Sequence, residues 1–139
     1  MRNFQLLDVV TFDNLAGSIQ FTTEEALIAK PVVTAQREGG YVAISASYGP
    51  LEIAIRPRFQ ELARVLGRLH PVEGLQTTRQ VGTAQAYLAI GLKPDGLLLL
   101  RPTVVGDATG HIGFNLALGS AAREAFFKWL PIDSEQVSN

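Results

Sequence analysis

Cysteine is absent from the 139-residue chain, and neither sign of charge dominates. The first absence excludes disulfide bonds, thiol nucleophiles and thiolate metal ligands together. The charges are balanced, because the chain has 12 lysines and arginines and 13 aspartates and glutamates, for a net charge of -1. Proteins dedicated to duplex DNA usually carry a basic excess. Any contact with nucleic acid would therefore have to come from a local cluster of basic residues.

Long hydrophobic runs are also missing. No run approaches the roughly 20 apolar residues that a transmembrane helix needs. The first residues lack the apolar centre of a signal peptide, and Asp8 interrupts them. We therefore expect a cytoplasmic protein that makes no membrane contact.

Recognisable catalytic motifs are the third absence. The sequence has no glycine-rich phosphate loop and no nucleophile elbow around its serines. His70 and His111 lie far apart in the sequence, and the single carboxylate of Asp107 near His111 is weak evidence for a metal or catalytic site. We therefore expect no enzymatic activity, no cofactor and no metal. A small-molecule-binding barrel or enzyme would need a large enclosed pocket with converging polar groups, and the sequence predicts none.

The chain is instead rich in apolar residues, with 47% hydrophobic against 18% charged. Disordered chains are polar and charged, so most of this length is expected to fold. The length suits one ordinary domain. We expect residues 1–131 to form it and residues 132–139 to form a flexible polar tail. Sheets buried on both faces or a subunit interface would absorb the apolar excess, and we expect a homo-oligomer.

Apolar and polar residues alternate in two separate runs, which is the pattern of half-buried strands. The first run predicts strands at 4–12, 17–22, 32–36, 41–48 and 51–56, and the second predicts strands at 75–81, 86–93, 97–100 and 111–118. Turn signals separate them, among them Pro-Asp-Gly at 94–96. An amphipathic helix follows each run, one starting at Pro57 and one capped by Ser120. The sequence therefore predicts an α+β fold in which two runs of about four antiparallel strands are each followed by a helix.

Two stretches add detail to this layout. In residues 17–48, a proline-containing strand leads through an Arg-Glu-Gly-Gly segment at 37–40 into an apolar strand, and residues 85–96 form a hairpin with a Lys-Pro turn. With the order of elements, they resemble the Whirly-like fold of single-stranded DNA-binding transcriptional regulators. The resemblance implies oligomerisation through helices and binding of single-stranded DNA. That family carries a lysine- and glycine-rich motif on an early strand. The matching segment of this chain, residues 15–21, has one glycine and no lysine.

Arginines and tyrosines supply the candidate binding residues. Nine of the 12 basic residues are arginine, which favours planar recognition over diffuse charge. Four of them cluster in or beside the first predicted helix, and Arg58 is one of these. Proteins that bind single strands combine cationic grooves with aromatic stacking platforms. The candidate nucleic-acid-binding residues are Arg56, Arg64, Arg68, Arg79, Arg101, Tyr41 and Tyr87. We therefore expect a non-enzymatic protein that binds single-stranded nucleic acid as an oligomer.

Two other interpretations remain open. In the first, Arg64 pairs with Glu61 on an ordinary solvated helix face, and the tyrosines belong to the core or its rim. In the second, the protein is an interaction or assembly factor without nucleic-acid binding, as its high hydrophobic fraction and near-neutral charge suggest. A sheet face of small residues would let another layer approach, and that layer could be the chain's own helices, a second subunit or a ligand. The small residues are Ala43, Ser45, Ser47, Ala89, Gly91, Gly113 and Ala117. Candidate arginines that share one face favour nucleic acid, whereas scattered or acid-paired arginines favour assembly.

Overall fold

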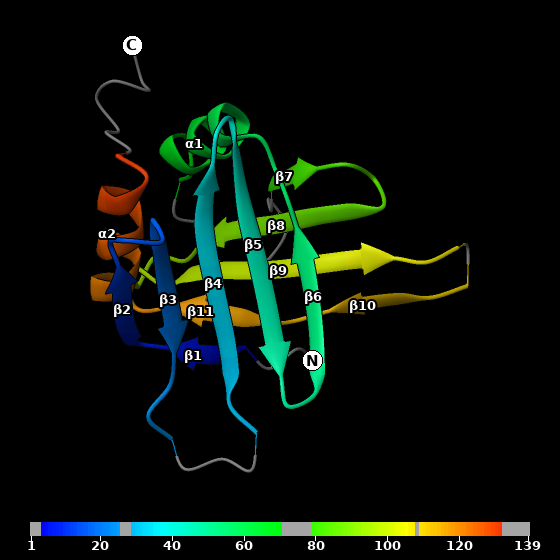
Figure 1. The fold of residues 1–139 in the computed structure, drawn as a ribbon, viewed down its shortest axis with the longest axis horizontal. Coiled ribbons are helices and arrows are strands. Elements are labelled where there is room, and N and C mark those ends of the chain that lie inside the picture. Colours follow the sequence, from blue (N-terminus) through cyan, green and yellow to red (C-terminus); the bar gives the residue numbers. More distant parts are fainter. Residues whose placement is uncertain (1–3, 26–28, 71–78, 108, 132–139) are drawn as a thin grey trace.

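The computed structural model describes residues 4–25, 29–70, 79–107 and 109–131. Two β-sheets and two helices make up this part of the chain. The strands of one sheet run steeply across those of the other (Figure 1), which is the arrangement of orthogonal sheet packing. The mixed α+β class with mostly antiparallel sheets, predicted from the two alternating runs, is confirmed.

The five-stranded sheet is an antiparallel meander formed by the first run. Its strands in spatial order are β2 (Val9–Asp13), β3 (Ser18–Thr22), β4 (Pro31–Glu38), β5 (Tyr41–Tyr48) and β6 (Leu51–Ile55). Alternation in β5 works as predicted, because Val42, Ile44 and Ala46 are buried while the residues between them are partly exposed. Each strand pairs with its sequence neighbour, so short turns suffice to connect them.

The six-stranded sheet is built mainly from the second run. Its order is β1-β11-β9-β8-β7, with β10 also pairing with β9. The bounds are β1 (Gln5–Leu7), β7 (Arg79–Gly82), β8 (Ala86–Leu92), β9 (Leu98–Val105), β10 (His111–Gly113) and β11 (Leu116–Leu118). The predicted strand at 75–81 begins at Arg79 within the described residues, since 71–78 lie outside them.

The first predicted strand, 4–12, is wrong as a single element. It divides at the exposed Asp8 into β1 and β2, which belong to different sheets. β1 pairs in parallel with β11, with Gln5 opposite Leu116, whereas β2 pairs with β3. A chain that turns the corner between two crossed sheets must leave one hydrogen-bond ladder before it enters the next. The described strands therefore number five in the first sheet and six in the second, rather than four in each run.

A proline explains why the predicted strand at 111–118 is interrupted. The register that pairs β10 with β9 continues unchanged into β11, so Phe114 faces Pro102 and Asn115 faces Arg101. Phe114 N–H donates to the carbonyl oxygen of Pro102 at 3.1 Å, but Pro102 has no N–H to return. The predicted strand at 111–118 is therefore present as two short strands of one continuous register.

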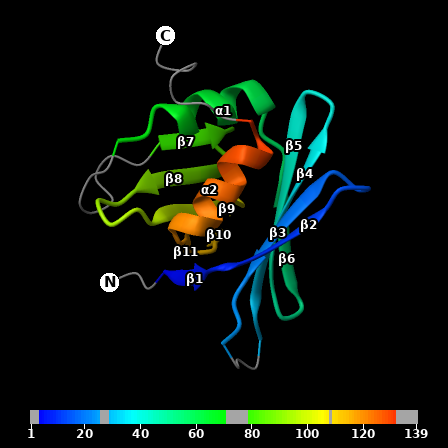
Figure 2. The same cartoon turned by 90° about the vertical axis from the view of Figure 1, so that its left-hand side faces the viewer.

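The core lies between the sheets, where buried residues of both meet the helix α2 (Ser120–Trp129). The ring of Phe126 on α2 stands edge-on to Phe21 of β3, with 5.5 Å between centroids. Both helices lie on the side of the five-stranded sheet that faces the other sheet (Figure 2). The outer face of the five-stranded sheet carries neither helix.

Both helix starts differ from their predictions. The helix α1 spans Phe59–Gly67 with Arg58 at its N-cap, instead of starting at Pro57. Pro57 stays extended because its carbonyl oxygen accepts a hydrogen bond from Val42 N–H at 3.0 Å. In α2 the N-cap is Gly119, and Ser120 is already helical with no side-chain cap.

In the parts that the structure describes, no helix is long and apolar enough to span a membrane.

Candidate nucleic-acid interface

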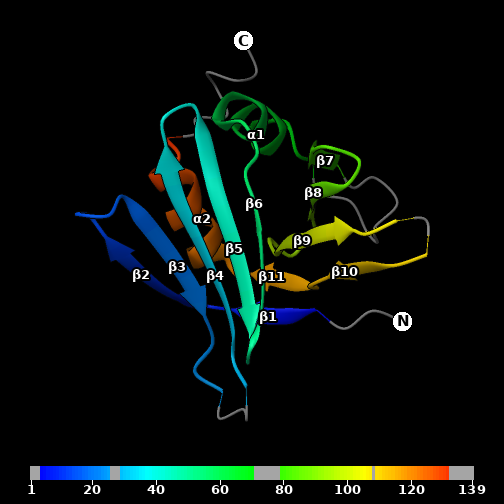
Figure 3. The same cartoon turned by 45° about the vertical axis from the view of Figure 1, so that its right-hand side comes forward.

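The tip of the β4–β5 hairpin is tied to the start of α1, and this junction organises the site. Phe59 N–H donates to the carbonyl oxygen of Gly40 at 2.9 Å, and Tyr41 forms an isolated antiparallel bridge with Arg58. The turn between β4 and β5 lies beside α1 in two views (Figures 1 and 3). Segments that are distant in the sequence therefore present their side chains together at one end of the five-stranded sheet.

Arg37 contributes to the site from the carboxyl end of β4. Its guanidinium carbon lies 3.9 Å from the centroid of the Phe59 ring, which is cation–π distance. Phe59 packs against the core and is partly buried, so Arg37 covers its exposed side. This contact fixes an exposed arginine beside the first turn of α1.

Arg56 contacts both an aromatic ring and an acid. Its guanidinium carbon is 5.6 Å from the centroid of the Tyr41 ring, and its Nη2 is 2.9 Å from Glu38 Oε1. The two charged side chains are 62% and 39% exposed, and such surface pairs contribute only about 0–1 kcal/mol. Tyr41 itself is 41% exposed. One arginine of the site is thus partly neutralised, while the tyrosine ring remains accessible.

Arg64 and Arg68 lie one helical turn apart and both are exposed. The interpretation in which Arg64 pairs with Glu61 is not borne out by the contacts, because the ion pairs among the described residues are Arg56–Glu38 and Lys93–Asp95. At 1.5 Å per residue, Arg68 lies about 15 Å along the helix from Arg58. We call the set of exposed arginines at this end of the five-stranded sheet the arginine surface. It consists of Arg37, Arg56, Arg58, Arg64 and Arg68. Arg37 lies on the inner side beside Phe59, and Arg56 lies on the outer side beside Tyr41.

The structure divides the seven candidate residues predicted from the sequence. Arg56, Arg64, Arg68 and Tyr41 belong to α1 and the strand ends beside it. Arg79 is exposed at the start of β7, a strand that contacts α1. Arg101 and Tyr87 lie elsewhere, on the outer face of the six-stranded sheet. The candidates therefore do not share one face.

Arg37 is the member of the arginine surface that sequence reasoning missed. Its position just before a Gly-Gly turn indicated only a hairpin. The signal lies in a contact across the fold, because the backbone bond between Gly40 and Phe59 brings β4 to the helix. A basic residue at a hairpin tip that precedes an arginine-rich helix is a pattern that could have suggested it.

The predicted face of small residues is also divided. Ala43, Ser45 and Ser47 lie on the outer face of the five-stranded sheet, where the cross-strand row runs Gln20, Thr34, Ser45, Ala54. The remaining four small residues lie on the outer face of the six-stranded sheet, and they are Ala89, Gly91, Gly113 and Ala117. The small residues are thus divided between two sheets, and on the six-stranded sheet Gly91 and Ala117 are buried.

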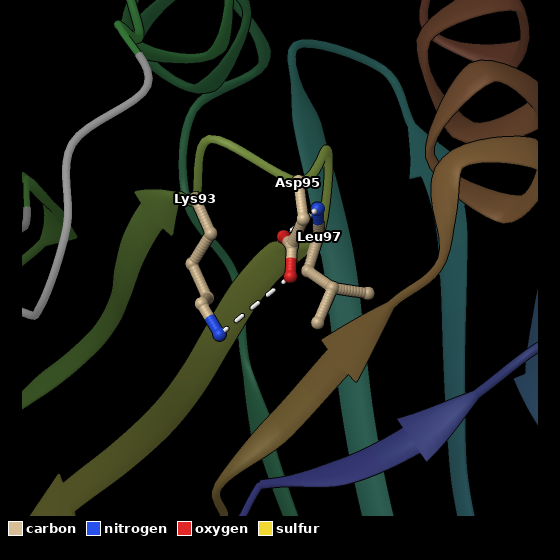
Figure 4. A network of polar contacts seen from close by, with 3 residues as sticks. All are labelled: Lys93, Asp95 and Leu97. Atoms are coloured by element: carbon tan, nitrogen blue, oxygen red, sulfur yellow. Dashed lines mark hydrogen bonds and ion pairs between the residues drawn. The ribbon is translucent and has the colours of Figure 1, made fainter.

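A second turn shows basic charge that is balanced locally. Lys93 Nζ lies 3.8 Å from Asp95 Oδ2 in the β8–β9 hairpin, and Leu97 N–H donates to Asp95 Oδ1 at 3.1 Å (Figure 4). Gly96 completes the turn at φ +92°, a conformation that favours glycine. The predicted Pro-Asp-Gly turn is therefore present, and its lysine stands apart from the arginine surface.

The metal site considered from the sequence is not assembled within the described part of the chain. No group of three metal-ligating side chains occurs among the residues that the structure describes. The Asp107 carboxylate instead accepts two hydrogen bonds within its own loop. Thr109 donates to Asp107 Oδ1 from its hydroxyl, at 2.6 Å, and from its backbone N–H, at 2.9 Å. These bonds lower the pKa of the exposed Asp107 carboxyl below its ordinary value. Asp107 thus stabilises the β9–β10 loop.

An apolar gap between the sheets is too small to be a ligand site. Its lining includes Phe21, Val33, Leu88, Leu100 and Phe126, and it holds about one water-sized space. Binding pockets for small molecules are far larger and include converging polar groups. This gap is a packing imperfection beside α2.

The arginine surface is thus defined by its own geometry. It joins three segments, carries one described ion pair and borders the exposed Tyr41. Comparison of the chain with protein-family models, with curated proteins and with solved structures gives no match.

Proposed function

We propose that the protein binds single-stranded nucleic acid through the arginine surface and Tyr41. The observation that carries the proposal is the concentration of five of the nine arginines on α1 and the strand ends tied to it. Glu38 and Glu61 are the acids of the same segments, so this end is basic although the whole chain has a net charge of -1. Guanidinium groups contact phosphates in a forked geometry, and an exposed ring can stack on a base.

The order of elements supports a further part of the proposal. Strand run, helix, strand run and helix follow one another as in the Whirly-like layout. We propose that the chain shares that arrangement and acts as a homo-oligomer. The early lysine- and glycine-rich motif of that family has no counterpart in residues 15–21, so the arginine surface would take over the phosphate contacts.

Removal of three arginines tests the phosphate contacts. In the variant Arg56→Ala/Arg64→Ala/Arg68→Ala we expect a labelled oligonucleotide to bind at least tenfold more weakly at low salt. We also expect the log–log salt slope to fall by about 2, since each contact with a single strand contributes about 0.7. Fluorescence anisotropy at several salt concentrations measures both quantities.

The matched control removes the same charge elsewhere. The variant Lys30→Ala/Lys93→Ala/Lys128→Ala changes the net charge equally, and its residues lie outside the arginine surface. It should retain most of the affinity. Equal losses in the two triple variants would show that general charge, and no particular surface, governs binding.

Two tyrosines at opposite ends of β5 test the stacking platform. Tyr41 and Tyr48 are 41% and 49% exposed, and among the described residues a cation–π contact with an arginine occurs at Tyr41 and not at Tyr48. Since a stacked base contributes about 1–3 kcal/mol, Tyr41→Ala should weaken binding about 5- to 150-fold. Tyr48→Ala should change affinity little in the same titration. A larger effect at Tyr48 would place the bound strand at the other end of the sheet.

The alternative function is protein assembly, and two observations favour it. First, the candidate arginines do not all share one face, and Arg56 is paired with Glu38. The second observation concerns the outer face of the five-stranded sheet. The outer face of the five-stranded sheet has an uncharged central row of small and hydroxyl side chains, and both helices lie on the opposite side. Another protein layer could approach this face closely. A stable oligomer in light scattering that binds no oligonucleotide at low salt would support assembly and exclude the nucleic-acid proposal.

A further inference from the structure

Arg101 occupies the outer face of the six-stranded sheet, apart from the arginine surface. It lies within β9 and pairs with Ala89 of β8, while the continuing register places Asn115 on its other side. The side chain is partly buried although it is charged. A partly buried charge needs compensation from its surroundings. The contacts of this guanidinium therefore indicate what it does.

Neutral groups hold the guanidinium in place. Arg101 Nε donates to Asn115 Oδ1 at 2.9 Å, and Nη1 lies 3.4 Å from Thr103 Oγ1. The Thr103 side chain is itself fixed, because its hydroxyl donates to the carbonyl oxygen of Arg101 at 3.1 Å and the residue is 1% exposed. The described ion pairs involve other residues. Arg101 is thus oriented without being neutralised.

Gly113 shapes the space for the guanidinium. A Cβ atom at this position would lie 3.0 Å from both Cζ and Nη2 of Arg101, and 3.3 Å from Nη1. These distances are tighter than ordinary van der Waals contacts, so a Cβ at this position would require the guanidinium to shift by a few tenths of an ångström. The guanidinium therefore lies directly on the backbone of β10. Gly113 faces Thr103, and Thr103 faces Tyr87, so a hydroxyl-bearing ring stands in the same cross-strand row.

Several hydrogen-bond donors are left over at this place. Among the described residues, the hydrogens of Nη2 and one hydrogen of Nη1 have no acceptor, and the amide NH2 of Asn115 has none either. An arginine with a free fork favours planar, two-point contact with an oxyanion. A bound anion would also supply the charge compensation that the neutral neighbours do not.

We propose that Arg101, Asn115 and Tyr87 form a binding site for a small oxyanion, a carboxylate or a phosphate group. Arg101 supplies the charge and the fork, Asn115 adds its amide, and Tyr87 borders the anion with its hydroxyl. Gly113 and Thr103 set the orientation of the guanidinium. This site is on a different sheet from the arginine surface, so it is independent of the nucleic-acid proposal.

The test follows the Arg101 side chain directly by NMR. The Nε–Hε signal of Arg101, identified by its loss in Arg101→Lys, is recorded during titration with sodium phosphate, sodium acetate or sodium chloride at constant ionic strength. We expect a saturable shift with phosphate or acetate and none with chloride. The anion that binds more tightly identifies the ligand class. Equal responses to all three salts would overturn the proposal.

Two variants connect the shift to the geometry. Gly113→Ala should weaken anion binding at least tenfold, whereas Gly110→Ala should not, because a Cβ at Gly110 meets nothing within 4 Å. Asn115→Asp keeps nearly the same shape but offers Arg101 a carboxylate of its own, so it should also lose binding. Unchanged affinity in folded Asn115→Asp protein would contradict the site even if Gly113→Ala did not fold.

Discussion

Replacement of Phe126 by alanine is expected to lower the free energy of unfolding by about 3–5 kcal/mol. The ring is 2% exposed and lies at the centre of the core, edge-on to Phe21 and stacked on Trp129 at 6.2 Å between centroids. It also lines the gap between the sheets, so truncation would enlarge a space that is already incompletely filled. Small domains have only about 5–15 kcal/mol of stability in total. Urea denaturation followed by circular dichroism measures the loss.

Phe12 provides the matched control for this prediction. It is the same residue type, but it lies on the edge strand β2 and is 51% exposed. Phe12→Ala should therefore cost less than about 1 kcal/mol. Similar losses at both positions would mean that α2 does not fasten the two sheets together as its contacts indicate.

Gly82 is the second position where a substitution is expected to have a large effect. Its φ is +122°, and a Cβ atom would lie 2.6 Å from the carbonyl oxygen of Ala86 and 3.1 Å from Tyr87 Cα. Both neighbours are backbone, so neither can rotate away. Gly82→Ala should cost about 2–4 kcal/mol, since the backbone conformation alone costs about 1–3 kcal/mol. The free energy of unfolding in urea is the measurement.

Two other glycines separate the causes of that loss. Gly39 has φ +63° with open space around its Cβ position, so Gly39→Ala should cost about 1–2 kcal/mol through conformation alone. Gly40 has open space and no positive φ, so Gly40→Ala should change stability by less than about 0.5 kcal/mol. An order other than Gly82, Gly39, Gly40 would refute the steric account of the β7–β8 turn.

Local patterns predicted the elements whose determinants are local. Alternation along β5 and the Pro-Asp-Gly turn before β9 each depend on residues a few positions apart, and both occur where they were expected. The class of fold follows from such elements, because two alternating runs need two buried faces. The amphipathic spacing after each run likewise indicated α1 and α2.

Features that depend on distant partners could not be predicted. Asp8 looked like one residue of a continuous strand, but the crossing of the sheets divides the chain there. Pro57 matched a helix start, but pairing with Val42 keeps it extended. The candidate site shows the same limit. Arg101 resembled the other arginines in sequence, and only the register with Asn115 separates it from them.

The parallel pairing of β1 with β11 has a consequence for how the protein is made. Strands β2 to β6 follow one another in sequence, so the meander can assemble from contacts with short loops while synthesis continues. The edge of the six-stranded sheet cannot close until Leu118 has left the ribosome, because its pairing partner Leu7 lies far earlier in the sequence. Such long-range closure slows folding. β1 would thus join last and close the edge of the six-stranded sheet.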